Sequence, residues 1–178
     1  LQNGKSEIIW VGSTDDGKSE RIIASTLGDG CEIGTQMSYQ VFDPLKGTPI
    51  DAKANSIVEL TNPVIEGAEY AVTGEAGNYF FCLLLDQALN VVGNQIFLYK
   101  ISPSSKYFES GVKIDQIASG NLLILGNSRG VSNQMTSDEF FFIELESQTM
   151  NPMWTSIYKY DNCNSARDFE IKSGMGDT

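Results

Sequence analysis

The chain has 178 residues, of which 23 are acidic and 12 are basic, so its formal net charge is −11. It contains no histidine, which excludes an imidazole general base, a Ser-His-Asp or Cys-His nucleophile pair and a His-ligated metal within this chain. The acidic balance argues against nucleic acid as a partner, because phosphate backbones are bound by Lys and Arg, and no apolar run approaches the roughly 20 residues of a membrane-spanning helix.

Short runs of β-branched and aromatic residues follow one another along the chain, separated by Gly, Asn, Asp, Ser and Pro. Helical periodicity is nearly absent, so the pattern predicts an all-β fold. In chain order the expected strands are 7–12, 21–25, 37–42, 56–60, 69–74, 79–85, 95–100, 112–118, 121–126, 139–145, 153–159 and 166–172.

These strands recur at a regular spacing. Three of them end at a glycine, Gly12, Gly74 and Gly126, and each is followed by a polar loop and a second apolar strand. The third strand of each copy starts at 37, 95 and 153, which lie 58 residues apart. One further strand comes before the glycine-ended strand in the repeat. Its copies start at 56, 112 and 166, with spacings of 56 and 54. This regularity predicts a four-stranded repeat of about 50 to 60 residues.

Repeats of four strands are typical of β-propeller blades, in which stacking buries both faces of each sheet. The run Phe80-Phe81 and the run 140–142 have no polar alternate and favour such two-sided burial. The first blade would comprise 7–12, 21–25 and 37–42 completed by 166–172, the second about 56–100 and the third about 112–159. Propellers typically have about four to eight blades, so three blades would be part of a larger propeller or half of a dimeric ring. A β-sandwich is the alternative architecture.

The second and third copies share further residues. Leu85-Asp86 is followed by Asn90, and Leu145 is followed by Asn151 and Trp154. On these residues the chain resembles uncharacterised secreted or surface-anchored bacterial β-propeller proteins. The resemblance implies an exported binding or scaffolding module, extracellular or at the cell surface with the periplasm as the alternative, and it carries over no catalytic residue. The first copy departs from the pattern, because 21–25 lacks the aromatic residues and the Leu-Asp pair.

Four residues expected in loops on one propeller face are the candidate ligand-binding residues, and they are Tyr107, Phe108, Arg129 and Tyr160. Exposed aromatic rings flanked by polar groups suit stacking against sugars. The alternative is that these rings cover the rim of a blade.

The sequence predicts no cofactor, with a bound calcium ion as the alternative. Asp161, Asn162 and Asn164 supply oxygen atoms at close spacing, and Ca²⁺ binds about six to eight oxygen ligands. The same residues could form a turn. Of the three cysteines, Cys82 is expected to be a small buried thiol, and Cys31 and Cys163 are expected on opposite faces and not bonded to each other.

The function expected from these features is a non-enzymatic module that recognises a protein or a glycan through loops on one propeller face. One alternative is a polysaccharide hydrolase or lyase that uses carboxylates, for which Asp15 and Asp16 form the adjacent acid pair. The competing role of Asp16 is in a turn, because Asp16-Gly17 is a common hairpin dipeptide. A purely structural role as a spacer is the third possible function. Besides a ligand, the partner could be a second copy or the remainder of a longer chain.

Overall fold

The computed structural model describes residues 8–28, 32–61, 65–101, 107–130, 138–159 and 165–171. Within these ranges the chain consists of strands and connections without a helix, which confirms the all-β prediction. The strands are β1 (Ile8–Asp15), β2 (Glu20–Leu27), β3 (Ile33–Tyr39), β4 (Val41–Phe42), β5 (Pro49–Ile50), β6 (Ala52–Glu59), β7 (Tyr70–Ala76), β8 (Tyr79–Leu85), β9 (Val91–Tyr99), β10 (Tyr107–Gln116), β11 (Leu122–Gly130), β12 (Asp138–Leu145) and β13 (Pro152–Lys159).

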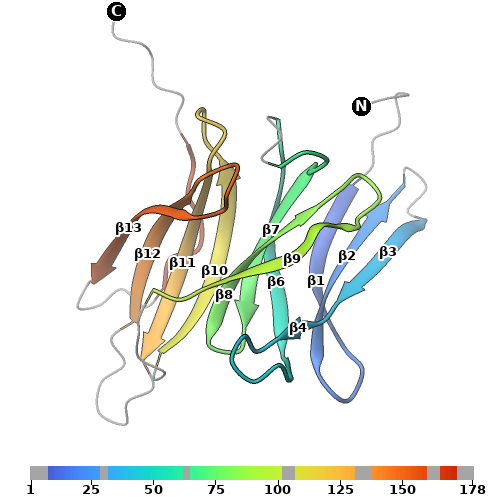
Figure 1. Cartoon of the computed structure of the whole chain (residues 1–178), viewed down its shortest axis with the longest axis horizontal. Helices are drawn as coiled ribbons and strands as arrows, with labels where there is room; N and C mark the ends of the chain where they lie inside the picture. The colour runs from blue at the N-terminus through green and yellow to red at the C-terminus, as the bar shows by residue number, and fades with distance from the viewer. Residues whose placement is uncertain are drawn as a thin grey trace, which may run out of the picture.

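The strands form separate antiparallel sheets, and none of these sheets closes on itself. The first sheet has the order β1-β2-β3, the second β6-β7-β8-β9 and the third β10-β11-β12-β13. Figure 1 shows these three sheets one after another in chain order. The short β4–β5 hairpin lies between the first and second sheets in the chain, and it divides the expected strand 37–42 between β3 and β4. The four strands expected for the second and third copies lie together in one sheet each.

The prediction that three strands end at a glycine is wrong, because β1, β7 and β11 continue past Gly12, Gly74 and Gly126. Two of these glycines permit a close approach instead. A Cβ on Gly74 would overlap the carbonyl oxygen of Lys53 on β6, and a Cβ on Gly126 would overlap the ring of Phe141 on β12. Glycine inside a strand commonly marks such a contact rather than an end.

The expected completion of the first sheet by 166–172 is not found in the described part of that segment. Residues 165–171 form no strand, and they lie against the third sheet. There the Asn127 side chain donates to the Ala166 carbonyl at 3.0 Å and accepts from its N–H at 2.9 Å. Phe169 packs edge-on against Phe142. These contacts hold the segment on the third sheet, so the first sheet has three strands and β1 forms its edge.

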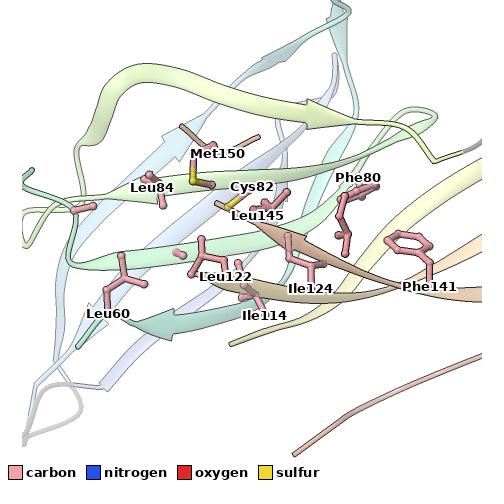
Figure 2. Packing of buried hydrophobic residues seen from close by; sticks show 13 residues of the cluster. Leu60, Phe80, Cys82, Leu84, Ile114, Leu122, Ile124, Phe141, Leu145 and Met150 are labelled. Atoms are coloured by element: carbon pink, nitrogen blue, oxygen red, sulfur yellow. The ribbon is translucent and has the colours of Figure 1, made fainter. Parts of the chain in front are cut away.

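β8 lies at the centre of the molecule and is buried on both faces. Its residues from Phe80 to Leu85 are all 0% exposed. Because successive side chains of a strand point to opposite faces, Phe80, Cys82 and Leu84 share one face. Figure 2 shows these three side chains facing the third sheet, where they pack in one cluster with Ile124 and Phe141. The prediction of two-sided burial is confirmed for this strand.

The opposite face of β8 packs on the first sheet. Phe81, Leu83 and Leu85 lie in a second cluster with Ile22 and Ala24 of β2. Side chains of β6 and β7 complete this cluster. The second sheet is therefore enclosed between two neighbouring sheets.

A tyrosine on the outermost strand of one sheet bonds to a turn of the next sheet, and this contact occurs twice. The Tyr39 hydroxyl donates to the Leu89 carbonyl at 2.5 Å, and the Tyr99 hydroxyl donates to the Met150 carbonyl at 2.7 Å. Leu89 and Met150 have positive φ angles of 63° and 59°, each in the turn before the outermost strand of its sheet. The two junctions between sheets are thus built alike.

Two-sided burial of β8 predicts that both of its faces are equally sensitive to truncation. Phe80→Ala and Phe81→Ala should each lower the free energy of unfolding by about 3–5 kcal/mol, because each leaves a cavity at a different junction. The measurement is urea unfolding followed by circular dichroism. Leu45→Ala is the matched control, since Leu45 is 86% exposed and should change the free energy by less than about 0.5 kcal/mol. A substitution at either phenylalanine that behaves like the control contradicts the packing.

Candidate functional site

Three of the four predicted ligand-binding residues lie at one end of the third sheet. Tyr107 and Phe108 begin β10, and Arg129 lies near the end of β11. Their placement in loops is wrong, because the β10–β11 ladder continues as far as the pair Tyr107–Gly130. Aromatic residues fit a pleated, half-buried surface, which favours this extension of the strand. Tyr160 lies outside the described residues.

Phe108 and Arg129 are register partners across β10 and β11, so their side chains emerge on the same face of the sheet. Phe108 is 49% exposed, and Arg129 is exposed as well. Tyr107 precedes Phe108 in the strand and points to the other face. A ring beside a guanidinium offers a flat cationic surface for stacking and hydrogen bonding. We call Phe108 and Arg129 the rim pair.

A buried carboxylate positions the start of β10. Glu109 is 1% exposed, and its Oε2 accepts a hydrogen bond from the backbone N–H of Ile101 at 2.6 Å. A hydrogen bond to a buried carboxyl group avoids the cost of leaving that polar group unsatisfied. This bond fastens β10 to the chain that leaves β9 and so fixes the backbone next to Phe108. Sequence reasoning missed this role, because only the burial of Glu109 reveals it.

The predicted calcium ligands Asp161, Asn162 and Asn164 lie outside the described residues, as do Cys31 and Cys163. Within the described ranges, no group of three or more Cys, Asp or Glu side chains is arranged to hold a metal ion. Cys82 is fully buried, as predicted, and burial raises the pKa of its thiol. The thiol is therefore part of the core.

Asp16, half of the predicted acid pair, organises a turn. Its carboxylate accepts hydrogen bonds from the N–H groups of Lys18 and Ser19 at 2.9 and 3.1 Å and lies 2.7 Å from the guanidinium of Arg21. The pKa of Asp16 is lowered, first by the bond from Lys18 and then by that from Ser19. A general acid in glycoside hydrolysis needs a raised pKa instead. The local geometry therefore favours the turn role.

An open groove of about 480 Å³ lies between the outer parts of the first and second sheets. It is lined by Tyr39, Gln40, Val41, Phe42, Val91, Gln95, Ile96 and Leu98. Among these eight described residues there is no carboxylate, ammonium or guanidinium group. The groove thus suits an apolar or amide-bearing group rather than a charged one.

Four aromatic side chains on the third sheet form a surface that sequence reasoning did not single out. We call Phe140, Phe142, Trp154 and Tyr158 the outer aromatic face. The rings of Phe140 and Tyr158 stack with their centroids 5.1 Å apart, and Phe142 meets Tyr158 edge-on at 6.2 Å. The Trp154 indole N–H donates to the Glu144 carboxylate. The expected two-sided burial of the run 140–142 is wrong within the described residues, because Phe141 is 0% exposed but Phe140 and Phe142 on the opposite face are only half-buried.

Comparison with protein-family models, with curated proteins and with solved structures finds no match to this chain. Among the described residues there is no helix with the length and apolar character needed to cross a membrane.

The Tyr39 bond beside the groove predicts a specific pH dependence. Burial, assisted by the charge of Asp86, raises the pKa of Tyr39 to about 12, from a usual value of about 10. The neutral phenol is thus favoured in the folded state. The neutral Tyr39 phenol therefore contributes fully to the free energy of unfolding below about pH 10, and this contribution is lost as the pH rises toward 12.

Tyr39→Phe removes both this titration and the bond to Leu89. Urea unfolding at pH 8 should show the variant about 1 kcal/mol less stable than the wild type. At pH 11 to 12 the difference should shrink or reverse. Parallel pH profiles for the two proteins would contradict the assignment.

Proposed function

We propose that the three sheets are blades of a β-propeller, and that the chain forms part of a larger propeller or half of a dimeric ring. Repetition of the packing supports this arrangement. The first strand of each later sheet crosses the sheet before it, since β6 packs on β1 and β2, and β10 packs on β6, β7 and β8. The tyrosine bond between sheets recurs at both junctions. A β-sandwich buries one face of each sheet, whereas the second sheet here is buried on both faces.

In our proposal the module is a non-enzymatic binding or scaffolding unit of a secreted or surface bacterial protein, and it recognises a protein or a glycan. The observation that carries the proposal is the rim pair, an exposed ring and guanidinium side by side on paired strands. Aromatic and Arg side chains contribute much of the binding energy in recognition sites. Strands hold such groups more firmly than loops do, and the bond from Ile101 to Glu109 fixes the β10 backbone next to Phe108.

Probing the chain with an array of defined oligosaccharides and with a displayed peptide library tests this function. At least one glycan or peptide class should bind and remain intact, without new reducing ends. Phe108→Ala and Arg129→Ala should each raise the dissociation constant about tenfold or more. Leu45→Ala is the control, because it removes an exposed apolar side chain elsewhere. Release of reducing ends would favour a hydrolase, and binding that both rim variants retain would remove the rim pair from the site.

A further inference from the structure

The outer aromatic face reproduces the face by which the second sheet holds the third. In the second sheet Phe80 pairs with Tyr99, and their rings stack at 5.2 Å. In the third sheet Phe140 pairs with Tyr158, and their rings stack at 5.1 Å. Tyr99 reaches forward to a carbonyl of the next sheet, whereas Tyr158 is 42% exposed. The third sheet therefore presents a face built to receive another sheet.

The segment 165–171 lies on the third sheet as β10 lies on the second. Hydrogen bonds between the first strands of successive sheets join residues 55 to 58 apart. The Asn55 side chain donates to Ser110 and to the Gly111 carbonyl, and the Ile114 N–H donates to Ser56. The ion pair between Lys113 and Asp168, at 3.4 Å, joins residues 55 apart and falls in this range.

The side chains of this segment also follow the first-strand pattern. β6 and β10 each contain a bulge, at Ala54/Ser56 and at Gly111/Lys113. The bulge lets residues three apart face the preceding sheet, namely Ala54 with Ile57 and Gly111 with Ile114. In 165–171 the Phe169 ring packs on Phe142 of the third sheet, and three residues earlier the backbone of Ala166 bonds to the Asn127 side chain. The segment therefore has the character of the first strand of a further sheet.

Within the described part of the chain, the first sheet has no such strand. β1 occupies the place that β7 and β11 hold beside β6 and β10. The residue two positions before the strand glycine is Trp10 in β1, Val72 in β7 and Ile124 in β11. Val72 and Ile124 are 0% exposed, whereas Trp10 is 38% exposed. A Cβ on Gly74 would overlap β6, but a Cβ on Gly12 would meet nothing closer than 3.8 Å. Both observations indicate that, within the described residues, no strand pairs with the free edge of β1 and no sheet covers the face that carries Trp10.

We propose that the segment 165–171 of one copy of this chain pairs antiparallel with β1 of a second copy. The third sheet of the first copy then packs its outer aromatic face on the outer face of the second copy's first sheet. By the register of β10 with β11, Ala166 lies opposite Gly12, Phe169 opposite Trp10 and Ile171 opposite Ile8.

The occupant that we propose is a second copy, because β1 and the segment 165–171 of one chain lie on opposite sides of the second sheet. The segment 165–171 lies against the third sheet, and Figure 1 shows the second sheet standing between that sheet and the first. Two copies together supply six sheets, within the range of about four to eight that closes a propeller. This inference rests on the propeller arrangement proposed above, but it does not involve the rim pair. The positions equivalent to Phe108 and Arg129 in the second sheet, Asp51 and Gly77, stay exposed although the third sheet covers that face.

Sedimentation equilibrium of the chain 1–178 tests the assembly. The expected species is a dimer of about 39 kDa, twice the chain mass of 19.5 kDa. Trp10→Asp and Tyr158→Asp lie on the two opposite flanks, and each should raise the dimer dissociation constant about tenfold or more. Leu45→Asp adds the same charge at an exposed apolar residue away from both flanks and should leave the dimer unchanged. A monomer at all concentrations overturns the proposal, as does a dimer that survives both flank substitutions.

An engineered disulfide tests the register. In a background with Cys31→Ser and Cys163→Ser, the pair Ile9→Cys and Glu170→Cys should form a disulfide between chains on mild oxidation, because the register places these residues opposite each other. The pair Ser13→Cys and Glu170→Cys is the control, since Ser13 lies four residues along β1, about 13 Å away. Cross-linking of the control pair in preference to the first overturns the strand exchange. Ligand binding by the rim pair is scored separately, so a monomer that still binds contradicts the exchange alone, and a dimer without a ligand contradicts the binding function alone.

Discussion

The structure depends on the burial of one strand on both of its faces. β8 has no polar side chain between Phe80 and Leu85, so neither face can be left in water. One face packs on the third sheet and the other on the first. Burial of large apolar side chains stabilises by about 1.5–3 kcal/mol each, and six consecutive residues of β8 are involved. The three sheets stack in chain order because the central one requires a neighbour on each side.

The two junctions that result are repetitions of one design. Each uses a bulged first strand laid across the preceding sheet and a tyrosine that bonds to a turn residue with positive φ. A bulge and a residue in the left-handed region each carry a local cost. Their recurrence at equivalent positions indicates that the geometry between sheets selects them. The exposed parts of this design, around Trp10 and Tyr158, stand at the two ends of the stack.

Much of the fold could be predicted from the sequence, because two-sided burial produces uninterrupted apolar runs such as that of β8 and because the repeat spacing exposes the order of strands. The role of the strand glycines could not be predicted from the sequence. A glycine that ends a strand at a turn and a glycine that permits a close contact inside a strand occur in the same local sequence. Gly74 and Gly126 belong to the second kind. The place of 165–171 was also missed. Its pattern marks a first strand, but the pattern does not say which sheet, or which copy, supplies its partner.

The candidate site was predicted in part. The sequence predicts Phe108 and Arg129 in loops on one propeller face, and the structure brings them together on paired strands. Glu109 escaped notice because a buried carboxylate cannot be told from an exposed one in a polar stretch. The outer aromatic face escaped notice because Phe140 and Phe142 follow the pattern of a core strand. Only the absence of a sheet above them, within the described residues, makes them a surface.

Amide hydrogen exchange of the folded chain tests most directly whether the stack is organised around β8. If β8 is enclosed between two sheets, its amides from Phe80 to Leu85 should exchange only through global unfolding, at the slowest rates in the protein. The amides of the outermost strands β3 and β13 should exchange faster through local opening. Exchange of β8 at the rate of β3 and β13 would contradict the account.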